Sequence, residues 1–322
     1  MSLKIGIIGV GGIAKRHYEG YQMAGAEVVA IADVFEKSLT ARQQEWGVRN
    51  AFLNYEDLLN LEEVQAVSIC TPNAYHHPAT LAAARAGKHI LCEKPISLNL
   101  EKAQEMIDVA RECGVVLQIG HHMRSNGAAY KAKQMIDNGD LGNITFMRLR
   151  QAHDWAGEET VRDSFGKLAN SGGGTLLDNG CHMFDLARYF AGEVESLYCQ
   201  MGTLKFDVEV EDTSLVSLRF KSGTIASVEN AWTATGWEEG FWIYGTKGAL
   251  EYTNRWEAPV LKHRFRDSPG TTWGDTDFAV YDFHTAGVGQ RHIMNFIDAI
   301  EGKREVICTG EDGLEAVRLV LL

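Results

Sequence analysis

Five short apolar runs, separated by helical patterns, occupy the first part of the chain. They are rich in Val and Ile, stay apolar at successive positions, and fall at residues 4–10, 27–33, 66–72, 89–95 and 115–120. Strands of this kind, joined by helices, form parallel sheets that are covered on both faces. Gly87 and Gly114 stand where glycine residues end helices. The pattern predicts an α/β domain with a doubly wound parallel sheet of the Rossmann type at residues 1–122.

A different pattern follows from residue 143. Longer runs, several of them alternating, fall at residues 144–154, 195–206, 213–232 and 241–252, and the glycine-containing turns KSG and TKG interrupt the last two. Helical patterns occupy residues 171–190, 291–302 and 311–322. We expect a second, α+β domain at residues 123–322, built on a large, mainly antiparallel open sheet that serves substrate binding and oligomerisation.

Charge and hydropathy argue against several classes of partner. The 322 residues carry a formal net charge of −12, which disfavours nucleic acid. No apolar run is long enough to span a membrane, and the first residues do not have the pattern of a signal peptide. The six cysteines are scattered, which favours reduced thiols. We expect a cytoplasmic protein with a small-molecule substrate.

A glycine-rich motif, G-x-G-x-x-A, follows the first run and opens the first helical pattern. Gly9 permits a tight turn, Gly11 lets a pyrophosphate approach the backbone, and Ala14 lets the helix pack close to the strand. Asp33 ends the next run at the distance expected for a carboxylate that binds a dinucleotide ribose. The predicted cofactor-binding residues of these segments are Gly9, Gly11, Gly12, Ile13 and Asp33.

Asp33 also favours NAD over NADP. Its carboxylate can accept both ribose hydroxyls of NAD, and it repels the additional phosphate of NADP. Val34 stands where a basic residue would bind that phosphate, and the nearest cations are Lys37 and Arg42. NADP is the less favoured cofactor.

Polar residues follow two further runs, at the sheet edge where ligands of open α/β folds bind. Thr71, Asn73 and His76 follow the third run and can hydrogen-bond a cofactor, although residues at a helix N-terminus also serve as caps. Glu93 and Lys94 end the fourth run. A lysine beside a nicotinamide stabilises an alcohol oxygen as it becomes a carbonyl oxygen. The alternative is a surface ion pair between Lys94 and Glu93.

Residues 171–190 form a helical stretch with ionisable side chains on one side. At about 100° per residue, Asp178, His182 and Asp185 share that side. In one interpretation His182 is a general acid/base and Asp178 orients it or the substrate. In a second, Thr175 and Asp178 form a capping box at the helix N-terminus. A metal site is disfavoured, because no third ligand stands at a defined spacing, so we expect none.

Together these motifs resemble the Gfo/Idh/MocA family of nicotinamide-dependent oxidoreductases. The resemblance covers nearly the whole sequence and includes GVGGIAKRH, TPNAYHHPATLAAARAGKHILCEKPISLN, GGGTLLDNGCHMFDLARYF and YGTKGALEY. It implies that Lys94, Asp178 and His182 form the catalytic group, and that Glu93 lies near the cofactor. It also implies a cis Lys94–Pro95 bond and association through the C-terminal sheet, as a homodimer or homotetramer.

The sequence departs from the family pattern at positions that bear on the substrate. GHHMRSN (120–126) has two histidines where the family often carries an aromatic residue or asparagine ahead of Arg124. Arg124 is one candidate for a substrate contact. Trp155 and Arg162, in the segment 152–171, are two others, although as residues of a solvated loop they need no role.

These observations lead to the hypothesis of an NAD-dependent dehydrogenase that oxidises a secondary alcohol of a sugar, an inositol or a related cyclic polyol. His182 removes the alcohol proton, and Lys94 stabilises the oxygen while hydride passes to the nicotinamide. Two rival functions are a glycosidase that uses tightly held NAD for transient oxidation, and a non-catalytic NAD or sugar sensor. A sensor has no need of the complete catalytic group.

Overall fold

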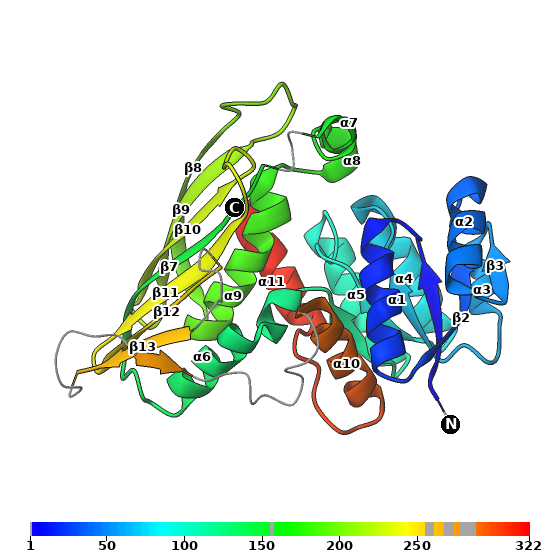
Figure 1. The fold of residues 1–322 in the computed structure, drawn as a ribbon, viewed down its shortest axis with the longest axis horizontal. Coiled ribbons are helices and arrows are strands. Elements are labelled where there is room, and N and C mark those ends of the chain that lie inside the picture. Colours follow the sequence, from blue (N-terminus) through cyan, green and yellow to red (C-terminus); the bar gives the residue numbers. More distant parts are fainter. Residues whose placement is uncertain (1, 155–157, 255–260, 267–273, 277–287) are drawn as a thin grey trace. The chain divides into compact units, whose positions relative to one another are not determined.

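A parallel sheet of six strands forms the centre of the N-terminal part of the computed structural model, which describes residues 2–154, 158–254, 261–266, 274–276 and 288–322 (Figure 1). The strand order is β3-β2-β1-β4-β5-β6, so the winding direction changes between β1 and β4. All described neighbours in this sheet pair in parallel. The strands are β1 (Lys4–Ile8), β2 (Glu27–Ala32), β3 (Asn50–Phe52), β4 (Ala66–Ile69), β5 (His89–Cys92) and β6 (Leu117–Ile119).

Helices connect these strands, as the sequence predicts. They are α1 (Gly12–Met23), α2 (Glu36–Trp46), α3 (Tyr55–Leu59), α4 (His76–Arg85) and α5 (Leu100–Glu112), with 3-10 turns η1 (Asn73–Tyr75) and η2 (His122–Ser125). Gly87 and Gly114 follow α4 and α5 with φ of 69° and 67°, which confirms that glycine ends both helices. The short elements β3 and α3 were not predicted, because three to five residues are too few for a periodic pattern.

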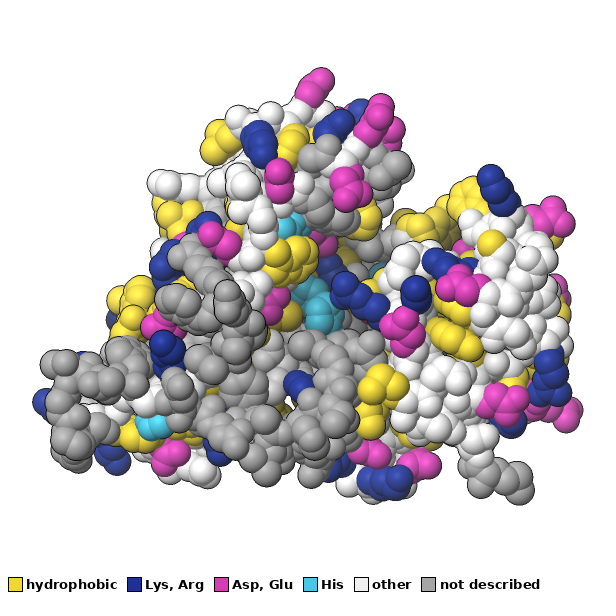
Figure 2. Space-filling view, in the orientation of Figure 1, with side chains coloured by type: hydrophobic (Ala, Val, Ile, Leu, Met, Phe, Trp, Pro, Cys, Tyr) yellow, Lys and Arg dark blue, Asp and Glu magenta, His cyan; other side chains and the backbone are white. Residues whose placement is uncertain are grey.

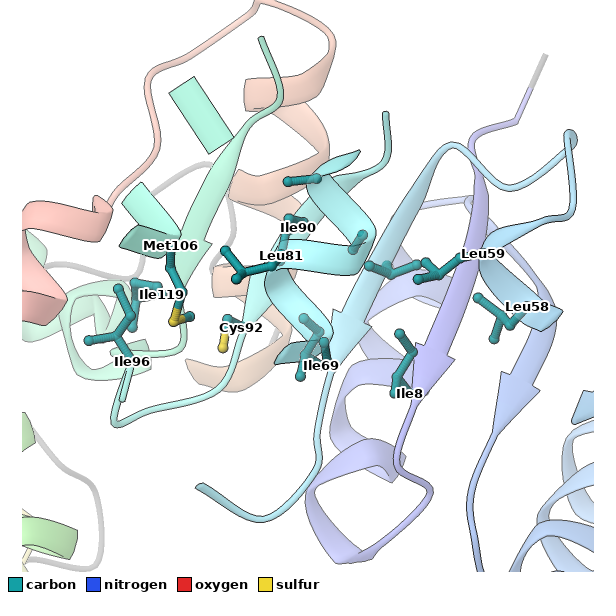
Figure 3. Close-up of a cluster of buried hydrophobic side chains, with 14 of the residues drawn as sticks. Ile8, Leu58, Leu59, Ile69, Leu81, Ile90, Cys92, Ile96, Met106 and Ile119 are labelled. Carbon is teal, nitrogen blue, oxygen red and sulfur yellow. The ribbon is translucent and has the colours of Figure 1, made fainter. Parts of the chain in front are cut away.

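Two apolar cores lie against the two faces of this sheet. Alternate residues of β1 divide between them, since Ile7 belongs to one core and Ile8 to the other. Figure 3 shows the core that contains Ile8, in which side chains from β4, β5 and β6 meet those of α3, α4 and α5. The doubly wound sheet predicted from the apolar runs is therefore confirmed.

The second sheet contains eight strands among the described residues, in the order β14-β13-β12-β11-β7-β10-β9-β8. Only β7 and β10 pair in parallel among its described neighbours, which confirms the mainly antiparallel sheet. Its strands are β7 (Ile144–Ala152), β8 (Val194–Gly202), β9 (Thr213–Phe220), β10 (Ile225–Ala231), β11 (Glu238–Gly245), β12 (Gly248–Thr253), β13 (Leu261–Phe265) and β14 (Gly274–Thr276). The hairpins β9–β10 and β11–β12 stand at the predicted KSG and TKG turns.

Helices cover one face of this second sheet (Figure 1). They include α6 (Gly127–Asp137), the π-helical turn η4 (Leu176–Gly180) and α9 (Cys181–Ala191), while α7 (Glu159–Ser164) and α8 (Leu168–Ser171) are short. Along each strand, side chains point alternately to the covered face and to the opposite face. In β9, Val216, Leu218 and Phe220 are buried while Leu215 is 47% exposed.

The chain divides into two compact units, Met1–Ser125 with Thr285–Arg318, and Asn126–His284 with Leu319–Leu322. The first boundary lies three residues beyond the predicted one at residue 122. The helices α10 (Val288–Ile300) and α11 (Gly310–Leu321) lie mostly in the first unit, whereas the sequence interpretation placed all of 123–322 in the second domain. The physical reason is burial, because Phe296 of α10 and Val317 of α11 complete the two cores of the parallel sheet.

The described residues contain neither a helix suited to cross a membrane nor a disulfide bond. No helix described here is long and apolar enough to cross a membrane. None of the six cysteines, all within the described ranges, forms a disulfide bond. On the face drawn in Figure 2, acidic and basic side chains are interspersed among the described residues.

Candidate active site

The glycine-rich turn lies where β1 runs into α1, beside the end of β4. Gly9 has φ of +86°, and a Cβ there would lie 2.8 Å from the carbonyl carbon and oxygen of Cys70 and 2.9 Å from the nitrogen of Thr71. The N–H of Gly9 donates to the Ala32 carbonyl at 2.8 Å. Only glycine allows this turn to pass so close to the next strand, and it does so at the point where the strand order changes direction.

Gly11 and Gly12 stand on the open side of the same turn. Both are exposed, and a Cβ on either one would meet no described heavy atom within 4 Å. The helix α1 begins at Gly12, so the first N–H groups of α1 are not used within the helix. Exposed glycines in front of a helix N-terminus suit the approach of a pyrophosphate.

Asp33 and Thr71 provide polar groups on either side of this turn. The Asp33 carboxylate accepts the N–H of Val10 at 2.9 Å and that of Phe35 at 2.8 Å, and each oxygen keeps a further lone pair. The Thr71 hydroxyl is buried and has no hydrogen-bond partner among the residues the structure describes. A buried hydroxyl of this kind calls for a partner. These residues therefore fit a dinucleotide cofactor.

His76, a predicted cofactor-binding residue, lies in the interior and contacts two backbone carbonyls. It is fully buried, and its Nδ1 and Nε2 lie 2.8 Å and 2.9 Å from the carbonyl oxygens of Pro95 and Thr71. Burial lowers the pKa of this imidazole, although the two carbonyls oppose the change. The contacts connect the segment after β4 with the segment after β5. Asn73 begins the 3-10 turn η1 between Thr71 and His76 and is partly exposed.

Glu93 and Lys94 follow β5, and the Lys94–Pro95 peptide bond is cis, as the resemblance implies. Glu93 is 9% exposed and lies 2.9 Å from Nε2 of His17. Burial alone would raise the pKa of Glu93, but the hydrogen bond from His17 and the positive charges of His17, His122 and Lys94 hold it at about 2. The carboxylate is therefore ionised at neutral pH, beside the segment that carries Lys94.

The stretch predicted as one regular helix contains a π-helical turn. Residues 176–180 form η4, and the α-helix α9 begins only at Cys181. Asp178 lies in the π turn and His182 in the α-helix, so the angular spacing of a regular α-helix does not hold between them. Single π turns in α-helices occur frequently at functional sites.

The predicted capping box between Thr175 and Asp178 is wrong. The Thr175 hydroxyl accepts from the Asn179 amide at 3.2 Å, and the N–H of Asp178 donates to the Gly174 carbonyl at 2.9 Å. Glu211 supplies the cap instead, since its carboxylate accepts the N–H groups of Gly174 and Leu176 at 2.9–3.1 Å. This negative charge also suits the helix N-terminus. Thr175 and Asp178 therefore do not form the reciprocal pair of a capping box.

Asp178 is partly exposed and accepts a hydrogen bond from a buried indole. Nε1 of Trp232 donates to Oδ2 of Asp178 at 3.2 Å, and Trp232 itself is fully buried. His182 is 3% exposed and Asp185 is fully buried, so the ionisable side of the helix faces inward. Cys181 is buried, and its thiol donates to the carbonyl of Asp178 at 3.4 Å. The π turn therefore holds one carboxylate that is open to solvent, next to a buried histidine.

An exposed tryptophan, Trp237, stacks on a histidine that contacts the π turn. Trp237 is 55% exposed and stacks on His153, with ring centroids 4.5 Å apart and planes 15° apart. His153 is buried, and its Nε2 lies 3.0 Å from the side-chain oxygen of Asn179, the neighbour of Asp178. The indole ring is thus held in place close to the π turn.

The predicted substrate residues fall in different places. Arg124 is 5% exposed, and its Nη1 donates to Asp312 at 2.9 Å and to the Ile307 carbonyl at 3.0 Å. These contacts attach α11 to η2, so Arg124 has a structural use here. Arg162 lies in α7 and is partly exposed. Trp155 lies outside the described residues.

Three residues with clear roles in these contacts were missed in the sequence: His17, Glu211 and Trp232. Ala14, His17 and Tyr21 are buried together on α1, at spacings of three and four residues. That spacing from Ala14 of the glycine motif is the signal that places His17 against the sheet. Glu211 and Trp232 contact residues that precede them by 35 to 54 positions, and no local pattern indicates such contacts.

Among the residues that the structure describes, no three His, Cys, Asp or Glu side chains are arranged to hold a metal ion. The polar groups gathered after β1, β2, β4 and β5 instead match those of a dinucleotide site.

Two protein-family models match the chain. Residues 3–121 match the oxidoreductase family with an NAD-binding Rossmann fold, and residues 130–251 match the GFO/IDH/MocA C-terminal domain. The 1,5-anhydro-D-fructose reductase of Ensifer adhaerens is 33% identical over 321 residues, which cover 96% of this chain and 91% of that protein. The myo-inositol 2-dehydrogenase of Thermotoga maritima is 30% identical over 328 residues, which cover 98% and 94%.

A solved structure is similar over the same length. Levoglucosan dehydrogenase in complex with NADH and levoglucosan superposes with a TM-score of 0.90, covering 99% of this chain and 95% of that one. The sequence identity is 24%, so this likeness bears on the fold alone.

Proposed function

Because the chain belongs to the GFO/IDH/MocA family of oxidoreductases, we propose that it is an NAD-dependent dehydrogenase of cyclic polyols. It oxidises a secondary alcohol of a sugar, an inositol or a related ring. The observation that carries the proposal is the glycine-rich turn of the first unit, in which Gly11 and Gly12 are exposed and Gly9 packs against the backbone of Thr71, whose buried hydroxyl has no partner among the described residues. The names of the two relatives support the substrate class, since each acts on a ring-shaped polyol or sugar derivative.

The proposed cofactor is NAD rather than NADP. The Asp33 carboxylate, which accepts the N–H of Val10, suits a pair of ribose hydroxyls, and the exposed Val34 follows it. Arg42, which together with Lys37 is one of the two nearby cations of α2, forms an ion pair with Glu45 and lies 5.4 Å from the Trp46 ring centroid. Its charge is therefore partly neutralised and less suited to a phosphate. Bound NAD supplies the hydride acceptor.

We assign the chemistry to Lys94, Asp178 and His182. His182 takes the proton of the alcohol, because an imidazole exchanges protons near neutral pH. The Lys94 ammonium stabilises the negative charge that develops on the oxygen. Asp178, fixed by the indole N–H of Trp232, orients the substrate hydroxyls or His182.

Trp237 supports a ring-shaped substrate. A fixed, half-exposed indole offers a flat apolar surface to the C–H face of a sugar or cyclitol ring, and a flexible open-chain polyol buries less area on it. We propose that Trp237 favours rings over open chains. In Trp237→Ala the KM for cyclic substrates should rise more than the KM for acyclic ones, and an equal rise for both would exclude this role.

The test of the function is NADH formation with a panel of inositols, aldoses and anhydrosugars, run in parallel with NADP. Lys94→Ala and His182→Ala should each lower kcat at least 100-fold on the best substrate. Lys102→Ala is the matched control, because Lys102 is an exposed lysine on α5 and should leave kcat unchanged. Near-normal turnover in the Lys94 or His182 variant contradicts the assignment.

Two rival functions give different results in the same assays. A glycosidase with tightly held NAD would cleave a glycoside without net release of NADH. A sensor would bind sugar and NAD, shown by calorimetry, without turnover of either. The proposed dehydrogenase releases one NADH for each alcohol that it oxidises.

We further propose that the chain forms a homodimer or homotetramer through the outer face of its second sheet. Large side chains remain exposed on that face: Phe146 (40%), Tyr198 (65%), Leu215 (47%), Ile225 (47%) and Tyr244 (40%). The register brings Ile225 opposite Phe146, and Phe146 opposite Tyr244, so these three form one apolar row. Ile225→Glu should shift sedimentation towards the monomer, and a monomeric parent protein would exclude the interface.

A cytoplasmic location is part of the proposal. It rests on the six cysteines, none of which is in a disulfide bond. Fractionation of cells that express a tagged chain tests the location, and recovery outside the cytoplasm would contradict it.

A further inference from the structure

A buried chain of hydrogen bonds runs from α1 to the segment that carries Lys94. The Tyr21 hydroxyl lies 2.6 Å from Oγ of Ser68, and that Oγ lies 2.9 Å from Nδ1 of His17. Nε2 of His17 lies 2.9 Å from Oε1 of Glu93. Four side chains from α1, β4 and the end of β5 are thus connected, and the His17 side chain is only 4% exposed.

The chemistry of the two ends constrains which groups donate in this series of hydrogen bonds. Glu93 is ionised and can only accept, so Nε2 of His17 donates. A neutral imidazole accepts at Nδ1 from the Ser68 hydroxyl, whereas a protonated one donates there, and in both cases Ser68 can accept from the Tyr21 hydroxyl. Burial raises the pKa of Tyr21, so its phenol keeps the proton that it donates. Every described member is satisfied, which makes the chain a rigid link.

The Glu93 end of this series of hydrogen bonds reaches the backbone N–H of Lys94. Oε2 of Glu93 accepts the N–H of Lys94 at 3.1 Å. The carboxylate also fits against Gly120, where a Cβ would lie 2.9 Å from Oε2 and from the carboxyl carbon. Glu93 is thus fixed by His17 on one oxygen, by Lys94 on the other, and by the absence of a side chain at Gly120.

We infer that His17 is a positioning residue, which holds Glu93 in place and thereby sets where the Lys94 side chain begins. The inference rests on the proposed function of Lys94. It gives α1 a second use besides the glycine-rich turn at its start, since the same helix that opens the cofactor site also fixes the reactive lysine. A shift of about 1 Å at a catalytic group costs up to 100-fold in rate.

A purely structural role for His17 is the alternative, and two variants of one residue separate the two roles. The amide of Gln reaches about as far as Nε2 of histidine, so His17→Gln keeps a donor to Glu93. The amide of Asn reaches about as far as Nδ1, so His17→Asn keeps the contact with Ser68 and loses Glu93. Both variants are uncharged and smaller than histidine.

The surroundings indicate that His17→Asn still folds. A cavity with room for about one water molecule adjoins the site and is lined by Ile13, Arg16, His17, Glu93, His122, His292 and Ile293. Water can therefore enter the space that the imidazole leaves and partly solvate Glu93. Thermal unfolding of each variant checks this.

The experiment measures kcat and KM of the parent, His17→Gln, His17→Asn and Lys94→Ala proteins with NAD and the best polyol of the panel. We expect His17→Asn to lower kcat about 10- to 100-fold, with both KM values within about threefold of the parent. His17→Gln should recover kcat to within about threefold. Equal activity in the two His17 variants overturns the inference, whether both are normal or both are impaired.

The Lys94→Ala protein separates this inference from the proposed function. If Lys94→Ala is as active as the parent, the proposed function of Lys94 fails, and the positioning role fails with it. If Lys94→Ala is inactive while His17→Asn turns over normally, only the role of His17 is refuted.

Discussion

Replacing Gly9 with alanine puts a methyl group where the structure has no room for one. Gly9 has φ of +86°, and its Cβ would lie 2.8 Å from backbone atoms of Cys70 and 2.9 Å from the nitrogen of Thr71. These neighbours belong to the end of β4 and cannot rotate away as a side chain would. The turn must therefore shift, or the first unit loses stability.

Two unfavourable contributions to the free energy of the folded state add in Gly9→Ala. A left-handed backbone conformation costs an L-residue about 1–2 kcal/mol, and overpacking against a rigid neighbour costs about 1–3 kcal/mol. The free energy of unfolding of the first unit should fall by about 2–5 kcal/mol. For a unit of this size the corresponding fall in Tm is roughly 5–15 °C.

Gly11→Ala is the matched control in the same turn. A Cβ there meets no described atom within 4 Å, so the Tm of the free protein should change by less than about 2 °C. The methyl group would nevertheless stand in the path of the pyrophosphate, and NAD affinity should fall at least tenfold. Calorimetry for Tm and titration for NAD binding measure both effects. A stable Gly9→Ala protein, or normal NAD binding by Gly11→Ala, would refute the account of the turn.

Three further changes test other parts of the account. Asp33→Asn removes the charge but keeps the shape, so the ratio of kcat/KM for NAD over NADP should fall at least tenfold, and an unchanged ratio would refute the role of Asp33. Glu211→Ala leaves the N–H groups of Gly174 and Leu176 without their acceptor and should lower the stability of the second unit by about 1–2 kcal/mol in urea unfolding, with Glu211→Gln intermediate. The pKa of Glu93 is lowered from 4.5 to about 2, so the stability from its ionised form is complete above pH 5 and is lost as the pH falls towards 2. Glu93→Gln should flatten that acid limb, and an equally steep limb in both proteins would contradict it.

The regular elements of both sheets could be predicted from sequence, because apolar runs and helical periodicity are local patterns. The π turn η4 could not, since a helical wheel assumes 3.6 residues per turn throughout, and nothing in the residues 176–180 marks the wider turn. The predicted capping box was wrong because it, too, was inferred from a local spacing alone. Thr175 and Asp178 have the right spacing, but Glu211 on a distant segment supplies a stronger, charged acceptor.

In the site, too, residues of a short motif could be predicted from sequence, whereas contacts between distant residues could not. The glycine turn and Asp33 belong to one short motif, and the structure places them at the same sheet edge as Thr71. The contact between His17 and Glu93 joins residues 76 positions apart. For Arg124, the sequence position fits a substrate contact, whereas in the structure its side chain is buried against Asp312.

The most direct test of the central claim follows hydride from a labelled substrate. The best polyol of the panel is deuterated at the carbon that is oxidised and incubated with NAD and the pure protein, and the mass of the product NADH is measured. Direct hydride transfer predicts one NADH for each molecule oxidised, carrying the deuterium, and loss of this product in Lys94→Ala and His182→Ala. NADH that carries no deuterium, or polyol turnover without any NADH, would contradict direct transfer from the alcohol carbon to NAD.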